Sequence, residues 1–160
     1  VAPWFSYIVV KPHGAGHFLS GVSITGNRFR SIIGGIDRAE RVDTTYADLD
    51  IARCKNIVMN GNSFHAVTAQ VQNAAEIEFT QNTPSSNWDI DASDYLPFDG
   101  QTLNVDSVVA QGPIRNASNV VQYDMPYVQQ IQGPDRNRIR VDWPTPVKGK
   151  VLIVVRMDNR

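Results

Sequence analysis

The composition of this 160-residue chain is that of a folded protein and excludes a disordered one, since 42% of its residues are hydrophobic and 19% are charged. Its net charge of -1 gives no general attraction to nucleic acid or to an anionic membrane. No apolar run reaches the ~20 residues that cross a bilayer. We therefore expect neither nucleic-acid binding nor membrane insertion. The single cysteine, Cys54, excludes an internal disulfide and is expected to be a small buried residue.

The charges are unevenly distributed along the chain. Residues 56–114 contain no Lys or Arg, whereas residues 115–160 contain eight basic and four acidic residues. Such a break indicates two structural regions with different surfaces. Because the chain begins with Val1 and not with Met, we expect it to be a fragment or a processed form of a longer protein.

The first region is predicted to consist of short strands. Residues 4–10 (WFSYIVV) form an apolar, β-rich run that ends before Pro12. The phrase GVSITGNRF at 21–29 then returns as NIVMNGNSF at 56–64. Each copy has two apolar residues two positions apart, followed by a turn and an Asn. This pattern predicts a short strand with one face inward, ending where Asn accepts a left-handed backbone.

A third, degraded copy of this phrase is EIEFTQNT at residues 76–83. From Val22 to Ile57 the step is 35 residues, and from Ile57 to Ile77 it is 20 residues. A step near 20 is typical of one solenoid coil, so we interpret the longer step as the same coil carrying an inserted loop at residues 30–50. Stacked Asn side chains are expected to form an amide ladder along the coils.

The second region is predicted to be antiparallel. Apolar and polar residues alternate over 103–109 and over 138–143, as in half-buried strands. Residues 150–156 (KVLIVVR) are apolar on both faces, so they belong in a sheet centre or against another chain. Gly-Pro at 112–113 and at 133–134 marks turns. About five strands within some 60 residues predict a small β-sandwich.

The repeated phrases resemble the coil signature of right-handed parallel β-helix proteins of the pectate-lyase-like superfamily, which includes polysaccharide lyases, polysaccharide hydrolases and bacteriophage tailspikes. The second region resembles the β-sandwich that often closes such proteins and commonly helps to hold a trimer. The resemblance implies an all-β chain: residues 1–97 are C-terminal coils of a parallel β-helix, and residues 98–160 are an antiparallel β-sandwich end domain.

The resemblance also implies a function. We expect the chain to be the C-terminal capping and assembly portion of an extracellular or virion-associated, polysaccharide-recognising β-helix protein, with a homotrimer as its assembly and polysaccharide as its other partner. The alternative is part of a polysaccharide lyase or glycoside hydrolase with carboxylates near Trp88 in the active groove. Whether this part of the chain is itself an enzyme is left open.

Three acids near Trp88 are the candidates for that chemistry, namely Asp89, Asp91 and Asp94. Glycoside hydrolysis uses a pair of carboxyl groups across the sugar bond, and lyases of the resembled family use Ca²⁺ held by acids. Asp89 and Asp91 fall on one face of a strand, close enough to share a hard cation. A solvated acidic surface, a Ca²⁺ site and a catalytic pair all fit this pattern. Beyond that Ca²⁺, no cofactor is expected.

Aromatic and basic residues supply the candidate binding groups. Trp88 and Tyr95 flank the acids, and rings beside carboxylates suit a sugar-binding surface, whereas a buried core or a plug at the domain junction is the alternative. Arg138 and Arg140 share the polar face of one strand. They fit binding to an anionic polymer, pairing with acids of a neighbouring chain, or plain solvent exposure. His13 and His17 lack a third ligand, so we predict no metal centre.

Overall fold

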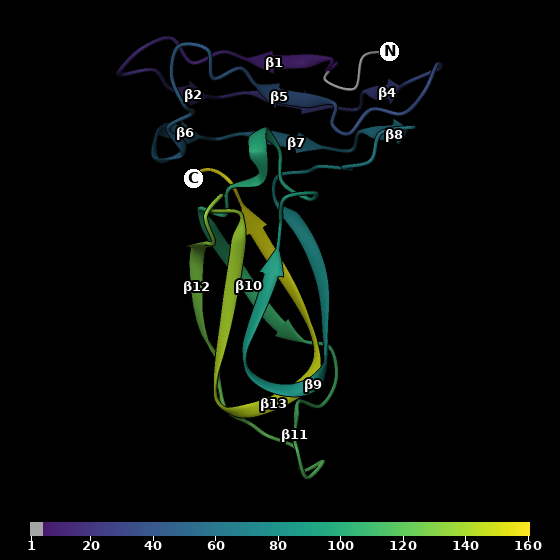
Figure 1. Cartoon of the computed structure of the whole chain (residues 1–160), viewed down its shortest axis with the longest axis vertical. Coiled ribbons are helices and arrows are strands. Elements are labelled where there is room, and N and C mark those ends of the chain that lie inside the picture. Colours follow the sequence, from purple (N-terminus) through teal and green to yellow (C-terminus); the bar gives the residue numbers. More distant parts are fainter. Residues whose placement is uncertain (1–4) are drawn as a thin grey trace.

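The computed structural model describes residues 5–160, which divide into a stack of short strands and a set of long antiparallel strands (Figure 1). Trp4, the first residue of the predicted opening strand, lies outside the described residues. The stack consists of the following strands, with the short 3-10 helix η1 (Ile51–Arg53) among them: β1 (Ile8–Val10), β2 (Leu19–Ser20), β3 (Ser23–Thr25), β4 (Arg28–Arg30), β5 (Glu40–Val42), β6 (Cys54–Lys55), β7 (Val58–Asn60) and β8 (Ser63–His65).

The short strands form four parallel pairs: β1 with β5, β2 with β6, β3 with β7 and β4 with β8. We call β1 to β4 the first coil and β5 to β8 the second coil; that they belong to a parallel β-helix stays a prediction. In the last two pairs Ile24 lies opposite Met59 and Phe29 opposite Phe64. The 35-residue step therefore separates β2, β3 and β4 from their partner strands. The prediction of an inserted loop at residues 30–50 is wrong, because this segment contains β5, which supplies the second coil with the strand that matches β1.

The repeated phrase produces the stacking that was predicted from it. The rings of Phe29 and Phe64 stack with their centroids 5.6 Å apart. Asn62 accepts hydrogen bonds at Oδ1 from the backbone N–H and the side-chain amide of Asn27, at 2.9 and 3.1 Å, which confirms the amide ladder. The left-handed turn residues, however, are the glycines just before these asparagines, Gly26 at φ 68° and Gly61 at φ 62°. A glycine adopts this conformation without the steric cost of a Cβ.

The prediction of a third coil is wrong. Residues 76–83 lie within β9 (Ala75–Asp91), which pairs antiparallel with β13 (Arg138–Arg156) and places Ile77 opposite Ile153. An alternation of apolar and polar residues specifies one buried face of a strand, and it is the same for parallel and antiparallel neighbours. The spacing of Ile77 and Phe79 therefore carried no information about the direction of the partner strand.

The remaining strands form one antiparallel sheet in which each pairs with β13: β9, β10 (Asn104–Ala110), β11 (Arg115–Asn116) and β12 (Tyr127–Gln132). Residues 150–156 lie between β9 and β10, so the predicted position in a sheet centre is confirmed. The structure thus confirms an all-β chain with an antiparallel sheet.

The long strands β9 and β13 bend sharply, and the two arms of the sheet face each other across the core (Figure 1). Trp88 contacts Phe79 on the other arm of β9 and Trp143 on β13, with ring centroids 6.1 and 5.2 Å apart. Since β9 precedes residue 97 but pairs with β13, the sheet extends across the predicted boundary at 97 and 98. The division into two domains stays a prediction. Across residues 5–160, no helix is long and apolar enough to cross a membrane.

Candidate functional site

The lower edge of the second coil is closed by segments from the rest of the chain. Asn159 bridges Lys55 of β6 in parallel, and its carbonyl accepts from the Asn56 N–H at 3.0 Å. Next to it, Asn73 bridges Met59 of β7 and donates its N–H to the Met59 carbonyl at 2.9 Å. The C-terminus accordingly lies beside β6, at the junction of the two parts (Figure 1). These bonds satisfy backbone groups that a free strand edge leaves unpaired.

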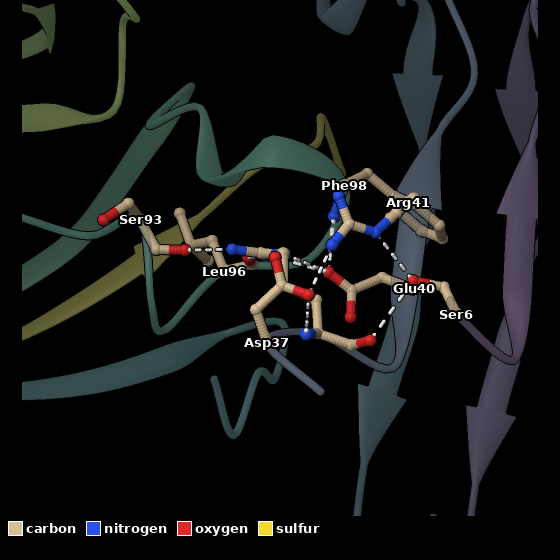
Figure 2. A network of polar contacts seen from close by, with 8 residues as sticks. Ser6, Asp37, Glu40, Arg41, Ser93, Leu96 and Phe98 are labelled. Carbon is tan, nitrogen blue, oxygen red and sulfur yellow. Dashed lines mark hydrogen bonds and ion pairs between the residues drawn. The ribbon is translucent and has the colours of Figure 1, made fainter. Parts of the chain in front are cut away.

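A buried ion pair lies beside β5 and joins this strand to the rest of the chain (Figure 2). Arg38 donates from Nε and Nη2 to Oε1 of Glu40 at 3.0 and 2.8 Å, and Glu40 is fully buried. The same carboxylate oxygen accepts from the backbone N–H of Phe98, in the 3-10 helix η2 (Phe98–Gly100), at 3.2 Å. Arg38 also donates to the carbonyls of Ser93 and Leu96, at 2.6 and 2.5 Å. One guanidinium thus joins the second coil to the turn that follows β9.

The electrostatics of this pair are finely balanced. Burial raises the pKa of Glu40, and the charge and hydrogen bonds of Arg38 oppose that rise. The second carboxylate oxygen, Oε2, is buried and has no hydrogen-bond partner among the described residues. A buried carboxylate with one unsatisfied oxygen is costly without its cation. The charge of Arg38 therefore offsets the free-energy cost of burying an ionised Glu40 at this position.

A second buried carboxylate, Asp158, closes the edge between β6 and β7. It accepts from the Ile57 N–H at 2.7 Å and from the side-chain amide of Asn73 at 2.7 Å. Arg156 holds it in two-point contact, with Nε and Nη2 at 3.0 and 3.1 Å from its two oxygens. Asn73 completes the link by accepting from the Met157 N–H at 3.0 Å. Asp158 and Asn73 therefore join Ile57 of the coil to the C-terminal segment.

The opposite edge of the stack has no such closure. In the described chain, β1 to β4 pair only with β5 to β8. Their outward backbone groups form the template for a further parallel strand on each side of the coil. The two-coil stack thus has one edge that is bonded to the rest of the chain at β6 and β7, which we call the closed edge, and one open edge.

A cleft of about 760 Å³ lies beside the closed edge. One wall is residues 48–52 of the second coil, and the other is formed by the start of the antiparallel part. Its polar lining residues are Arg38, Thr44, Asp48, Asp50, Asp99, Gln101, Asp135, Arg136 and Asn137. Asp50 forms an ion pair with Arg53 and caps the N-terminus of η1 by accepting the Ala52 N–H. Within the described residues, Asp48, Asp99 and Asp135 make no side-chain hydrogen bond or ion pair.

The backbone around this cleft is unusually strained. Asp99, Ile131 and Arg136 all line it and all have left-handed φ values, of 72°, 57° and 58°. This conformation is rare for a β-branched residue such as Ile131. Partial loss of hydration at the cleft wall raises the pKa of the Asp99 carboxyl, which still contacts solvent, although the charges of Arg38 and Arg41 lower it. Strained backbone beside a titratable group is common at functional sites, so the cleft is the best candidate for ligand binding.

The acids predicted near Trp88 do not form this site. Arg140 donates to Asp89 at 2.8 and 3.2 Å, and Arg138 lies 3.9 Å from Asp91, because the register of β9 and β13 places them opposite one another. The predicted arginines therefore pair with acids of their own chain. Burial acts to raise the pKa of Asp91, but hydrogen bonds from Ser93 and the charge of Arg138 lower it. Asp94 is exposed beyond the end of β9.

The two predicted aromatic residues, Trp88 and Tyr95, differ in their burial. Trp88 is fully buried, and its indole N–H donates to the carbonyls of Ser85 and Val147 at 3.0 and 3.2 Å. No face of the ring is available to stack on a sugar, so its assignment as a ligand-binding residue is wrong and the core alternative holds. A strand-internal Trp buries its ring when the opposite arm covers that face. Tyr95 is 41% exposed and lies outside the lining of the cleft.

The two histidines have unrelated contacts. The His13 ring lies against Tyr46, whereas His17 contacts the Gly14 carbonyl at 2.9 Å and accepts the Asp50 N–H at 3.0 Å. Among residues 5–160, no three His, Cys, Asp or Glu side chains are grouped so as to hold a metal ion.

The junction residues Arg38, Glu40, Asn73 and Asp158 were not predicted from the sequence. The available signal for the first two was their spacing, because an arginine two positions before an acid at the start of a strand can pair with it.

No protein-family model, no curated protein and no solved structure matches this chain.

Proposed function

We propose that this chain caps one end of a stack of parallel β coils, as the capping and assembly portion of a longer, extracellular or virion-associated β-helix protein that recognises polysaccharide. The observation that carries the proposal is the asymmetry of the stack. Its lower edge is bonded to the rest of the chain at β6 and β7 by Asn159 and Asn73, whereas its upper edge, along β1 to β4, is open.

The physical reason for such a cap lies in the coil itself. An uncapped coil presents a row of unpaired N–H and C=O groups on each side and templates the addition of another chain. A terminal unit with one polar, closed side is what a repeat array needs to remain soluble. Asp158 and Glu40 serve this purpose, because each accepts a backbone N–H at the junction and is neutralised by its own arginine.

The polysaccharide part of the proposal rests on the cleft. Carboxylates, amides and guanidinium groups along its walls are suited to hydrogen-bond the hydroxyl groups of a sugar chain. The available volume of about 760 Å³ accommodates a ligand of several rings.

Hydrogen exchange on the full chain tests the capping. The amides of Asn56 and Ile57, which bond to Asn159 and Asp158, should exchange slowly. Alternate amides of β3 and β4, which face the open edge, should exchange close to the rate of an unstructured peptide. Equal protection on both edges would contradict the proposed asymmetry.

A second candidate function, polysaccharide hydrolysis or lyase chemistry, is favoured by one observation: partner-free carboxylates share the cleft, and the pKa of Asp99 is raised. A general acid needs a raised pKa beside an ionised partner. The test is incubation of the chain with neutral and acidic polysaccharides, followed by assays for reducing ends and for unsaturated products. Asp99→Asn should abolish any cleavage, and Asp94→Asn, outside the cleft, should not.

A further inference from the structure

The antiparallel part contains a second hollow, separate from the cleft. It has a volume of about 350 Å³, within the range of small-molecule sites, and it shares no lining residue with the cleft. Its walls come from β10, from the segments on both sides of β11 and from β13, and most of the side chains in them are apolar. In Figure 1, β11 lies at the end of the antiparallel part that points away from the stack.

One polar atom in the walls of this hollow has no partner. Trp143 lines the hollow and is 8% exposed, so more than nine-tenths of this residue is buried. Its indole Nε1 makes no hydrogen bond within the described residues, whereas the adjacent Trp88 donates its own N–H to two carbonyls. A buried donor without an acceptor is costly, and an oxygen that accepts this N–H removes the cost. The hollow therefore favours a ligand that carries an acceptor.

The floor of the hollow narrows the kind of ligand. The buried members of the lining form this floor, and besides Trp143 they are the aliphatic Ile114 and Val151. An apolar floor with one side-chain donor suits a small group that has one acceptor and an apolar end. An acetyl group has both, because its carbonyl oxygen accepts an N–H and its methyl group packs against aliphatic side chains.

The exposed members of the lining form a polar rim. Tyr123 and Asp124 lie there, and neither side chain makes a hydrogen bond or ion pair with another described residue. A phenol hydroxyl and a carboxylate that are free in this way suit the hydroxyl groups of a sugar ring. An acetylated sugar therefore matches both levels of the hollow, with its acetyl group toward the floor and its ring at the rim.

The lining includes side chains that are free to move. The Trp143 N–H is covered in the structure, so an acceptor reaches it only after a lining side chain is displaced. Tyr123 and Met125 are 92% and 88% exposed, and residues 123–125 make no hydrogen bond with other described residues. Because few contacts hold these side chains, their displacement costs little and leaves the sheet intact.

We propose that this hollow binds an acetylated sugar unit whose carbonyl oxygen accepts the Trp143 N–H. The choice of a sugar rests on the polysaccharide part of the proposed function, whereas the second site and the acetyl group go beyond it. Because the hollow and the cleft have no lining residue in common, the two sites are tested separately.

Titration of the isotope-labelled full chain, followed by NMR through its indole N–H signals, tests this assignment. N-acetylglucosamine and glucose are the paired probes, because they differ only in the acetamido group that replaces one hydroxyl. The Trp143 signal is identified by its loss in Trp143→Phe. It should move downfield and saturate with N-acetylglucosamine, because a new acceptor deshields the proton, and it should stay in place with glucose. The Trp88 signal, whose proton is already bonded, should move less.

Three substitutions separate the hollow from its surroundings. Trp143→Phe keeps a ring but leaves the acetyl oxygen without its donor, so N-acetylglucosamine binding, measured on the Gln122 backbone amide in the wall, should weaken about five- to 150-fold. Ala110→Leu places a larger side chain in the hollow from an exposed position and should also weaken binding. Val109→Leu, on the opposite face of β10, is the matched control and should bind as the native chain does. Circular dichroism checks that each variant is folded.

The remaining outcomes are distinguishable from one another. A Trp143 signal that does not move with N-acetylglucosamine removes the site. Equal movement with both sugars removes the acetyl group from recognition, and movement with N-acetyl-lysine amide alone assigns the hollow to an acetylated protein.

Polysaccharide binding at the cleft is followed separately, by retardation of the chain in gels that contain polysaccharide without acetyl groups. Retardation with an unchanged Trp143 signal overturns this inference alone. A moving Trp143 signal without retardation supports the acetyl site and contradicts polysaccharide binding by the cleft.

Discussion

Replacing Arg38 by Met should be among the most damaging single changes to this protein. Glu40 is fully buried and its Oε2 has no partner among the described residues, so removal of the guanidinium leaves the carboxylate with backbone N–H donors and no cation. The carbonyls of Ser93 and Leu96 lose their donor as well. Breaking a buried ion pair from one side costs about 3–5 kcal/mol. For a chain of this size, that lowers the midpoint of thermal unfolding by about 10 °C.

The cost should depend on pH in a defined direction. Burial raises the pKa of Glu40 from its ordinary 4.5, and the opposing charge of Arg38 is lost in the variant, so the folded-state pKa rises further. A folded-state pKa above the unfolded value means that the folded state binds the proton more tightly. The relative stability of the variant is then greatest below about pH 4.5 and is lost as pH rises through the folded-state pKa. The difference from the native chain should therefore be larger at pH 7 than at pH 4.5.

Urea unfolding at the two pH values, followed by tryptophan fluorescence, measures this difference. The buried pair Trp88 and Trp143 provides the signal. Arg140→Met is the matched control, because it removes the same side chain from an exposed pair with Asp89, and exposed pairs contribute little. A cost for Arg38→Met no greater than that of the control, or one that does not shrink at pH 4.5, would refute this account of the junction.

Three further changes test other parts of the structure. Asn62→Ala should cost about 1–2 kcal/mol by removing the amide ladder, whereas Asn60→Ala, which breaks no side-chain hydrogen bond, should be neutral in urea unfolding. Gly100→Ala should cost about 3 kcal/mol, because its φ is +72° and a Cβ would lie 2.8 Å from a backbone carbon; Gly26→Ala, with open space at φ +68°, should cost about 1 kcal/mol. Burial raises the pKa of the Cys54 thiol to about 11, so at pH 8 a thiol reagent should label it only as fast as the protein unfolds, and immediate labelling of the native chain would contradict its burial.

Several features follow from the sequence because they are local. The repeat of Gly26-Asn27 at Gly61-Asn62 specified the coil turn, since residues in equivalent turns of successive coils must stack on one another. The apolar run at 150–156 predicted a central strand, and it lies between β9 and β10 with Val151, Ile153 and Val155 buried on one face. Cys54 was identified as buried from its type and its setting.

Other features were decided only by the tertiary structure. Asp89 and Asp91 have the sequence of a catalytic or cation-binding pair, but the register of β9 against β13 places an arginine opposite each of them. The position of Trp88 beside these acids suggested a ring that could stack on a sugar. In the structure, the bend of β9 places the opposite arm of the sheet over that ring. The contacts of Glu40 with Phe98 and of Asp158 with Ile57 join residues 58 and 101 positions apart. Periodicity along a chain determines which face of a strand is buried, but the partner of that face is determined by how distant segments pack together.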